Sequence, residues 1–322
     1  MQKYSNISFL ITGVAGFIAS HIAEHLLKNG AKRVVGFDNM ATGFQENIDL
    51  LQQYPNFEFI KADLADLDAC HQACVGIDLI CHQAAIGSVP RSVKTPELST
   101  QANILGFVNL VVAARDAGIK RIVFASSSSV YGDEPNLPKI EHRIGKPLSP
   151  YAITKYANEI MAWNFASLYD MEFIGFRYFN VFGPRQSPKG VYAAVIPLFI
   201  EACLHATPAY INGDGLQTRD FTYVDNVVQA NIKALFTEKK EAINEVYNIG
   251  MGGRYTLLDL YKNIAEITNC PHPPIHRENR AGDIRDSQAN VDKAMHLLGY
   301  TPAVNLKEGL QLTVEWFKKQ KL

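Results

Sequence analysis

Short apolar segments alternate with longer amphipathic segments along the first 180 residues of the chain. The short segments are rich in Val, Ile and Phe, which is typical of strands that are buried on both faces. They cover residues 7–11, 33–37, 57–60, 77–81, 121–125 and 172–176. Between several of them, apolar residues recur at helical spacing, over 17–29, 66–75, 103–117 and 152–169. The pattern predicts six strands that alternate with helices.

Strands that alternate with helices form parallel sheets, because each helix carries the chain back to the start of the next strand. We therefore predict an α/β fold with a doubly wound parallel sheet, which binds ligands at the carboxyl ends of its strands. Beyond about residue 180, Pro, Gly and aromatic residues divide the chain into shorter pieces that indicate a smaller mixed α/β lobe. We assign residues 1–180, with a return near 222–250, to the sheet domain and 181–322 mainly to the lobe.

The balance of charge excludes partners that a strong electrostatic field attracts. The 322 residues include 31 Lys and Arg against 32 Asp and Glu, so we expect neither nucleic acid nor a membrane as a partner. The five cysteines lack the spacing of a disulfide framework and no secretory leader precedes them, which predicts a soluble, reduced, cytoplasmic protein. Two pairs, His272 with His276 and Cys70 with Cys74, have no further ligands at a suitable spacing, so we expect no metal.

A glycine-rich turn follows the first predicted strand. Gly13 and Gly16 stand in the segment TGVAGFIA, where glycine lets the backbone approach a pyrophosphate and the next helix presents unpaired N–H groups. Taken alone, this spacing also fits a simple tight turn. Asp38 ends the second strand, where a carboxylate accepts hydrogen bonds from an adenine ribose and repels a 2′-phosphate, so we expect NAD rather than NADP. Asp63, after the third strand, either meets the adenine or caps a helix.

A tyrosine and a lysine are four residues apart at the start of the predicted helix 152–169. Tyr151 and Lys155 share one helix face, where an ammonium group and a nicotinamide cation favour the phenolate that a general base needs. A lone Tyr-x-x-x-Lys is also common on solvated helix faces. Here a run of hydroxyls, Ser126 to Ser129, ends the fifth strand at the ligand-binding edge, and one of them can pass a proton to the tyrosine.

These residues resemble the extended short-chain dehydrogenase/reductases and, within them, the UDP-hexose 4-epimerases, especially those that act on UDP-N-acetylglucosamine. The resemblance runs along essentially the whole chain. It rests on TGxxGFI at 12–18, Asp38, Asp63, HQAA at 82–85, Asn103, the serine run, Tyr151, Lys155, RYFNVFGPR at 177–185, GDGxQTRDF at 213–221 and RAGD at 280–283. One departure is Ala19, where the family usually has glycine. The resemblance implies a Rossmann-type NAD-binding domain and a lobe that binds the nucleotide sugar.

The resemblance also implies a cofactor site and a mechanism. The NAD site would include Gly13, Gly16, Phe17, Ile18, Asp38, Asn39, Asp63, Leu64, Gln83, Tyr151, Lys155 and Tyr178. Tyr151 would remove the proton of the sugar 4-hydroxyl while C4 gives a hydride to NAD; the 4-keto sugar then turns over and receives the hydride on its opposite face. If the chain is aligned with the family on Val130-Tyr131-Gly132, Ser127 is the catalytic hydroxyl. If the length of the loop before Tyr151 is used instead, Ser128 takes this place, so both remain candidates.

A second set of residues would hold the UDP-sugar substrate by the same resemblance. Arg219 and Arg280 would bind the pyrophosphate, for which arginine is the better planar donor, and Asp283 would accept from the uridine ribose. Considered singly, either arginine also fits a surface ion pair. Asn180 would contact the phosphates and Tyr210 would lie near the uracil. The hexose would be surrounded by Gly87, Ser88, Gln186 and Ala194.

Ser287 carries the most information about the sugar. It occupies a position where many glucose/galactose epimerases of the family have a bulky tyrosine, so it leaves room for a 2-acetamido group. Gly87 similarly replaces a long basic side chain of some relatives, and both changes favour UDP-N-acetylglucosamine and UDP-N-acetylgalactosamine as substrates. The alternative for Ser287 is a cap of a local turn.

Other functions fit parts of this pattern. A UDP-glucuronate 4-epimerase or decarboxylase stays open, because a serine at 287 also tolerates a carboxylate. A 4,6-dehydratase needs an acid and a base where this chain has Ser128 and Ser129. A non-catalytic NAD-sensing protein is the least favoured, since Tyr151 and Lys155 are both present. The resemblance also predicts a homodimer through the helix that bears Tyr151 and the helix near 103–117.

Overall fold

A seven-stranded parallel sheet forms the centre of the computed structural model, which describes residues 4–189, 193–278 and 285–320. Its strands run in the order β11-β6-β5-β4-β1-β2-β3. They are β1 (Ser8–Thr12), β2 (Arg33–Asp38), β3 (Phe57–Lys61), β4 (Leu79–His82), β5 (Arg121–Ser127), β6 (Glu172–Tyr178) and β11 (Glu245–Ile249). The strand order reverses between β1 and β4, which opens a crevice at their carboxyl ends. The predicted doubly wound parallel sheet is confirmed.

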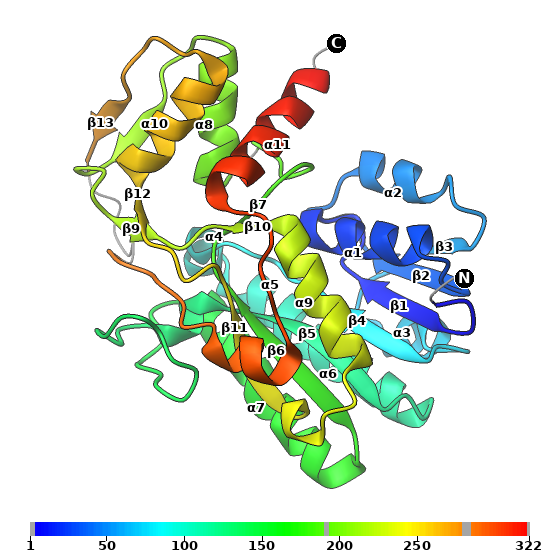
Figure 1. Ribbon diagram of the computed structural model, residues 1–322. Coiled ribbons are helices and arrows are strands. Elements are labelled where there is room, and N and C mark those ends of the chain that lie inside the picture. Colours follow the sequence, from blue (N-terminus) through cyan, green and yellow to red (C-terminus); the bar gives the residue numbers. More distant parts are fainter. Residues whose placement is uncertain (1–3, 190–192, 279–284, 321–322) are drawn as a thin grey trace.

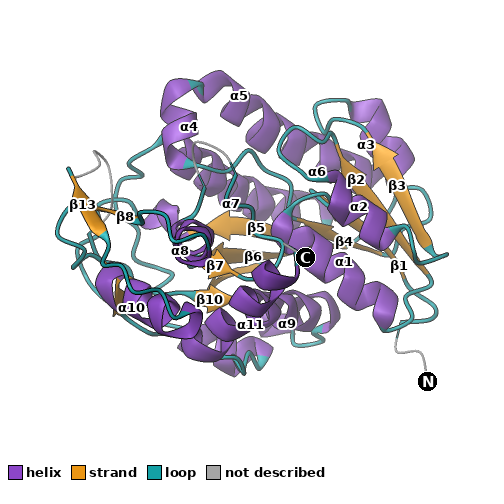
Figure 2. Cartoon of the chain, turned by 90° about the horizontal axis from the view of Figure 1, so that it is seen from above, coloured by secondary structure: helices purple, strands orange, loops and turns teal. Residues whose placement is uncertain are grey.

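Helices cover both faces of this sheet (Figure 2). One face packs against α1 (Phe17–Lys28), α2 (Gln45–Leu51) and α9 (Val224–Phe236). The other face packs against α3 (Leu67–Ala73), α6 (Gly106–Asp116) and α7 (Pro150–Tyr169). The apolar periodicity predicts α1, α3, α6 and α7, whereas α2 and α9 are not among the predicted helices.

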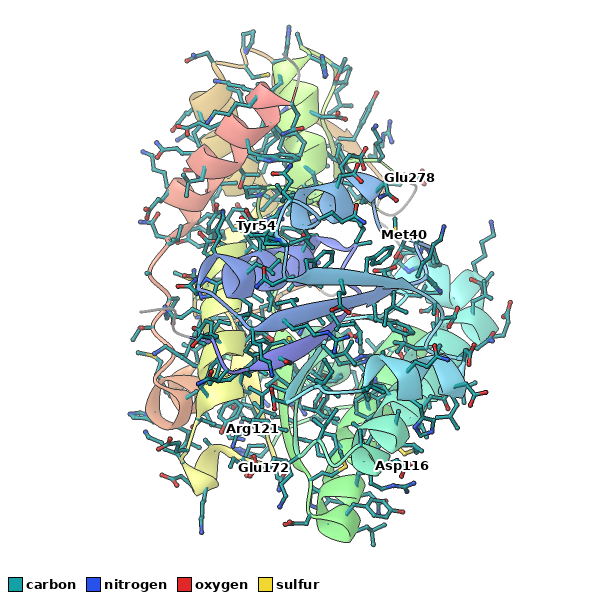
Figure 3. All side chains as sticks on the ribbon, turned by 90° about the vertical axis from the view of Figure 1, so that its right-hand side faces the viewer. Met40, Tyr54, Asp116, Arg121, Glu172 and Glu278 are labelled. Carbon is teal, nitrogen blue, oxygen red and sulfur yellow. The ribbon has the colours of Figure 1, made fainter. Side chains whose placement is uncertain are left out.

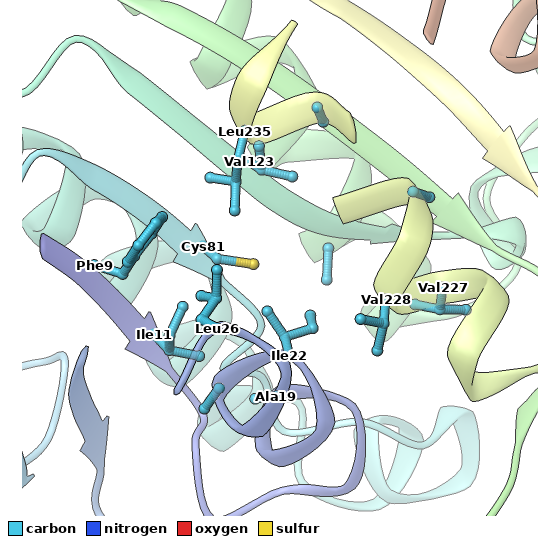
Figure 4. Packing of buried hydrophobic residues seen from close by; sticks show 14 of the residues in the cluster. Phe9, Ile11, Ala19, Ile22, Leu26, Cys81, Val123, Val227, Val228 and Leu235 are labelled. Carbon is cyan, nitrogen blue, oxygen red and sulfur yellow. The ribbon is translucent and has the colours of Figure 1, made fainter. Parts of the chain in front are cut away.

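On the α1 and α9 side, buried apolar side chains of these helices pack against buried apolar side chains of the sheet (Figure 4). Ile22 and Leu26 of α1 belong to one buried cluster with Val227 of α9, and all three are completely buried. Phe9 of β1 and Cys81 of β4 contribute from the sheet. Burial raises the pKa of the Cys81 thiol to about 12, so this cysteine is a packing residue rather than a nucleophile.

A smaller lobe lies beside the carboxyl ends of the strands, at the top of Figure 1. Its helices α8 (Val195–Leu204), α10 (Leu257–Thr268) and α11 (Leu306–Lys319) share one apolar core. Three two-stranded sheets complete it or join it to the rest of the chain: β7 (Val181–Phe182) with β10 (Thr222–Tyr223), β9 (Thr218–Arg219) with β12 (Tyr255–Thr256), and β8 (Tyr210–Asn212) with β13 (Ile275–Arg277). Ligands held at the sheet edge therefore face this lobe.

Short helices occur in several of the connections between these elements. They are α4 (Val89–Lys94), α5 (Pro96–Thr100), η1 (Gln101–Leu105), η2 (Ser128–Tyr131), η3 (Lys240–Ala242) and η4 (Ala294–Leu298). After the first lobe segment the chain returns to the sheet through α9 and β11, and β11 pairs with β6. The assignment of 1–180 and 222–250 to one domain and 181–322 mainly to another stays a prediction. Among the described residues, no helix has both the length and the apolar character needed to cross a membrane.

Candidate active site

The glycine turn after β1 brings two backbones into direct contact. Gly13 has φ +74°, and a Cβ atom on it would lie 2.7 Å from Cα of Ala84 in the loop after β4. Gly16 starts α1 as its N-cap, with extended backbone, and a Cβ atom on it would lie 3.0 Å from the Gly13 carbonyl oxygen. The turn therefore keeps the N-terminus of α1 open toward the crevice, as pyrophosphate binding requires.

The carboxylate of Asp38 forms the neighbouring wall. Its Oδ2 accepts a hydrogen bond from the N–H of Ala15 at 3.0 Å and its Oδ1 accepts one from the N–H of Met40 at 2.8 Å. Burial, the larger influence, raises the pKa of Asp38, while the two backbone hydrogen bonds act against it. Asp38 thus holds the glycine turn in place as well as facing the site predicted for the adenine ribose.

Asp63 does not cap a helix. Its Oδ2 accepts from Nδ2 of Asn39 at 2.7 Å and its Oδ1 accepts from the N–H of Ala65 at 2.8 Å. The cap of α3 is Asp66, which accepts from the N–H of Ala69 at 3.1 Å. The alternative that assigns a capping role to Asp63 is therefore wrong, and its carboxylate lies on the crevice wall beside Asn39.

One crevice contains seven of the predicted cofactor residues. They are Gly13, Gly16, Asp38, Asn39, Asp63, Leu64 and Gln83. Phe17 and Ile18 do not line it, because Phe17 packs against the lobe core and Ile18 against the core below the sheet. Leu64 also packs closely against Gly106 of α6, where an added Cβ atom would lie 2.9 Å from the Cβ atom of Leu64.

Tyr151 and Lys155 lie at the start of α7 as predicted. The helix begins with the N-cap Ser149, whose hydroxyl accepts from the N–H of Ala152, and with Pro150 in its first turn. The N–H of Tyr151 donates to Oγ of the buried Ser92 on α4 at 3.0 Å. This contact anchors the first turn of α7 to the loop that borders the crevice.

The hydroxyl that meets Tyr151 is that of Ser127, the last residue of β5. Burial raises the pKa of Tyr151, and the hydrogen bond with Ser127 acts in the opposite direction. Oγ of Ser127 also accepts from the N–H and from the hydroxyl of Ser129, at 3.2 and 2.9 Å. Ser128 begins the turn η2 beside it.

Lys155 is almost completely buried, with 1% of its surface exposed. Its Nζ donates to the carbonyl oxygen of Ala125 at 2.8 Å and lies 6.0 Å from the centre of the Tyr151 ring. Burial lowers the pKa of Lys155 to about 8, while the carboxylate of Glu159 acts against this shift. The ammonium group is thus held beside the tyrosine in a setting where it releases its proton more easily than a solvated lysine.

Tyr178 lies next to the crevice, but its hydroxyl is bound within a buried network. It donates to Oε1 of Gln83 at 3.1 Å, and it accepts from Nδ2 of Asn231 on α9 at 2.9 Å. Nε2 of Gln83 donates to Oδ1 of Asn231 at 3.1 Å. Asn231 was not predicted as a site residue, although an asparagine on the apolar face of an amphipathic segment is a signal that a buried polar partner lies opposite.

Asn103 fixes the loop after β4 to α7. Its Oδ1 accepts from the N–H of Ile86 at 2.8 Å, and its Nδ2 donates to Oγ1 of Thr154 at 3.1 Å. Asn103 is 1% exposed, so both bonds are shielded from water. It belongs to the motifs that carry the family resemblance, and the structure gives it a positioning task between the crevice wall and the helix of Tyr151.

A second cavity lies in the lobe and collects four of the predicted substrate residues: Asn180, Ala194, Tyr210 and Arg219. Nη1 of Arg219 donates to the carbonyl oxygens of Thr218 and Arg285, at 2.9 and 3.0 Å. The cavity also contains Arg277, which sequence reasoning missed because the segment IHR of β13 carries no motif. The guanidinium carbon of Arg277 lies 3.2 Å from the centre of the Tyr210 ring.

The remaining predicted substrate residues line neither of these cavities. Ser88 caps α4, because its hydroxyl accepts a hydrogen bond from the N–H of Arg91. Nε2 of Gln186 donates to the carbonyl oxygen of Val181 at 2.9 Å. Gly87 is exposed. Ser287 is buried, and its N–H donates to the carbonyl oxygen of Thr218, next to Arg219. Arg280 and Asp283 lie outside the described residues. Within the described ranges, no group of three or more His, Cys, Asp or Glu side chains is arranged to hold a metal ion.

Comparisons with known proteins show the family of this chain. Residues 9–250 match the NAD dependent epimerase/dehydratase family, and the chain belongs to it. A UDP-glucose 4-epimerase of Mycolicibacterium smegmatis is 38% identical over 97% of this chain and 98% of its own length.

Two solved structures have nearly the same fold. A UDP-N-acetylglucosamine 4-epimerase from Methanobrevibacter ruminantium, in complex with UDP-N-acetylmuramic acid, is 36% identical with a TM-score of 0.92, over 98% of this chain and 99% of that one. A UDP-glucuronic acid 4-epimerase from Bacillus cereus, in complex with UDP-glucuronic acid and NAD, is 33% identical with a TM-score of 0.90, over 98% and 100%.

The crevice fits NAD. The close approach at Gly13 leaves no room for a side chain, the N-terminus of α1 opens at Gly16, and Asp38 presents a carboxylate at the end of β2. NAD is the cofactor of this family.

NADP is expected to bind about 100-fold more weakly than NAD, because its 2′-phosphate would face the carboxylate of Asp38. Isothermal titration calorimetry of the cofactor-free protein with both dinucleotides measures this ratio. Asp38→Asn, which removes the charge and keeps one acceptor oxygen, should reduce the preference to less than about tenfold. Equal affinities of the unmodified protein for NAD and NADP would remove Asp38 from the ribose site.

Proposed function

We propose that this chain is an NAD-dependent 4-epimerase of UDP-linked hexoses. The observation that carries the proposal is the group formed by Ser127, Tyr151 and Lys155, which meets at the carboxyl edge of the sheet beside the NAD crevice. A site that only sensed NAD would not require a tyrosine, a serine hydroxyl and a buried ammonium group beside it. The lobe cavity with Arg219 and Tyr210 supplies a place for the nucleotide.

Each residue of this group has one chemical task. Bound NAD supplies a reversible acceptor for the hydride at C4 of the sugar. Tyr151 takes the proton of the 4-hydroxyl as general base and returns it when the reaction reverses on the other face of the sugar. Ser127, in contact with the phenol oxygen, orients the sugar hydroxyl and passes its proton. Lys155 lowers the cost of the phenolate through its positive charge.

The activity is expected to fall at alkaline pH as Lys155 loses its proton. The pKa of Lys155 is lowered to about 8, so its ammonium form, which supports the phenolate, is present below that pH and lost above it. A profile of kcat/KM against pH should therefore decline with a midpoint near 8. Lys155→Arg keeps its charge throughout this range and should lose the alkaline decline, at a lower maximal rate.

For the substrate we propose UDP-N-acetylglucosamine and UDP-N-acetylgalactosamine. Ser287 is small and buried, and it follows Asp286, which forms a bridge with Thr218 beside Arg219. A Cβ atom added to Gly87 would meet nothing within 4 Å. By the family resemblance, each of these small residues stands where some relatives carry a larger side chain. The similarity to the Methanobrevibacter UDP-N-acetylglucosamine 4-epimerase supports the same choice.

Proton NMR tests the proposal directly. Purified protein is incubated with UDP-N-acetylgalactosamine, and separately with UDP-galactose and UDP-glucuronate, with and without added NAD. Interconversion of the acetylated pair at the highest kcat/KM is expected. Faster turnover of UDP-glucuronate would make the chain a UDP-glucuronate 4-epimerase, a candidate favoured by its similarity to the Bacillus cereus enzyme. No turnover of any UDP-sugar with NAD present would contradict the epimerase assignment.

Ser287→Tyr is expected to convert the sugar preference. A phenol ring at this buried position would take the volume proposed for the 2-acetamido group, so kcat/KM for UDP-N-acetylgalactosamine should fall by about tenfold or more. For UDP-galactose, which has a hydroxyl in place of the 2-acetamido group, kcat/KM should change by less than about threefold. Ser287→Ala is the matched control, because it removes the hydroxyl and adds no bulk. Parallel losses for both sugars in the tyrosine variant would place Ser287 away from the sugar.

We also propose a homodimer through α7. Ile153, Ile160 and Trp163 expose 53%, 53% and 66% of their surface, and their spacing puts them on one face of the helix. Leu105, at the end of η1, adds a residue that is 45% exposed near the same helix. A second copy of this face would cover these side chains. Analytical ultracentrifugation of the protein and of Trp163→Glu measures the association.

A further inference from the structure

Three consecutive residues at the end of β5 are bound to three residues spaced four apart on α7. Ser127 bonds to Tyr151, and the carbonyl oxygen of Ala125 accepts from Lys155. Between them, the hydroxyl of Ser126 donates to Oε1 of Glu159. The side chains at 151, 155 and 159 occupy one face of the helix. The contact between Ser126 and Glu159 therefore lies one helical turn beyond Lys155 on the face of α7 that carries Tyr151.

Glu159 is itself held by a buried ion pair with β6. Nε and Nη2 of Arg177 donate to its two carboxylate oxygens at 2.9 and 2.7 Å, a bidentate geometry. The side chains of Arg177 and Glu159 are only 3% and 6% exposed. Nη1 of Arg177 donates to the carbonyl oxygen of Glu141 at 2.8 Å, and its guanidinium group lies 4.9 Å from the centre of the Tyr131 ring. The carboxylate thus has one fixed orientation.

The pair connects three elements at one point. Arg177 belongs to β6, Ser126 to β5 and Glu159 to α7, so a shift of α7 along β5 would break all the bonds of Glu159 together. Apart from Glu159, the ionisable groups that act on Lys155 or respond to it are Tyr151 on the same helix and His82 on β4. His82 carries no charge at neutral pH, because burial and the nearby Lys155 lower its pKa to about 3. Among the described residues, Glu159 is therefore the carboxylate that acts on Lys155.

We propose that Glu159 is a positioning residue for the reaction: clamped by Arg177 and Ser126, it sets the register between α7 and the end of β5 that brings Tyr151 to Ser127. This inference rests on the proposed function, in which these two hydroxyls handle the proton of the sugar. Because the contact between them depends on the register of a helix against a strand, a small displacement of α7 reaches the reacting atoms.

Ser126→Ala is the first variant to test, because it removes the bond to Glu159 and leaves the ion pair intact. We expect kcat to fall by about tenfold while KM changes by less than about twofold, since binding contacts are unchanged and only alignment is lost. Glu159→Gln should lower kcat further, but it leaves Arg177 buried without its partner and needs a thermal melt beside the kinetics.

Glu172→Gln is the matched control. Glu172 pairs with Arg121 across the same two strands, β5 and β6, but at their amino ends (Figure 3), whereas Ser127 lies at the carboxyl end of β5. Its loss should leave kcat and KM within about twofold of the original values. An equal fall of kcat in Glu172→Gln, or an unchanged kcat in a folded Ser126→Ala protein, would overturn the positioning role.

A second readout requires no substrate. In protein labelled with carbon-13 at tyrosine Cζ, the resonance of Tyr151, assigned by its loss in Tyr151→Phe, reports the hydrogen bond with Ser127. It should shift in Ser126→Ala and in Glu159→Gln and stay in place in Glu172→Gln. An unmoved resonance in both active-site variants would overturn the inference. If the original protein epimerises no UDP-sugar but the resonance shifts as expected, the proposed function fails and the positioning role of Glu159 stands.

Discussion

Tyr151→Phe is expected to lower kcat by about 10²- to 10⁴-fold, the usual contribution of a positioned general acid and base. The change removes only the phenol oxygen, which bonds to Ser127, and keeps the ring that fills the first turn of α7. NAD binding should survive, because the crevice formed by Gly13, Asp38 and Gln83 does not depend on this oxygen. Turnover of UDP-N-acetylgalactosamine followed by NMR, together with calorimetric titration of NAD, measures the two quantities separately.

Tyr156→Phe supplies the control for this experiment. Tyr156 lies on the same helix but packs against the small cluster of Val130, Tyr131 and Phe179 rather than Ser127. Removing its hydroxyl should change kcat by less than about twofold. A Tyr151→Phe protein that binds NAD and keeps more than about a tenth of the original kcat would show that another group moves the proton.

The sheet and the chemistry at its edge could be predicted because both depend on local patterns. Buried parallel strands appear as short apolar runs, and the turn at Gly13 and the pair Tyr151 and Lys155 each have a characteristic spacing. Ser127 and Ser128 could not be separated by sequence, because they are adjacent and chemically identical. In the structure, Tyr151 is hydrogen-bonded to Ser127, which favours Ser127 as the proton relay.

The residues that were missed depend on tertiary pairing. Asn231 is 150 positions from Cys81 and 148 from Gln83, yet α9 brings it to both. Arg277 meets Tyr210 only because β13 pairs with β8. Phe17 and Ile18 stay predicted cofactor residues: their side chains pack into apolar cores, so their contact with the cofactor would be made by the backbone N–H groups at the start of α1. A motif therefore identifies the loop that binds, and packing decides which of its side chains do so.

Gly13→Ala is expected to lower the free energy of unfolding by about 3 kcal/mol, from the cost of a left-handed backbone and of overpacking. The residue has φ +74°, and a Cβ atom would lie 2.7 Å from both the backbone nitrogen and Cα of Ala84. The backbones at Gly13 and Ala84 can separate only if the turn after β1 moves away from the loop after β4. These two loops together line the NAD crevice. Affinity for NAD should fall along with stability.

Gly87→Ala separates this effect from the general cost of replacing glycine. A Cβ atom on Gly87 would meet nothing within 4 Å, and the residue is not among the glycines with positive φ. Its unfolding free energy should stay within about 0.5 kcal/mol of the original value, as for most surface substitutions. Urea denaturation of both variants, with and without NAD, gives the comparison. A Gly13→Ala protein that is as stable as Gly87→Ala and binds NAD equally well would contradict the close contact between the two backbones. The pyrophosphate would then have to bind at another place.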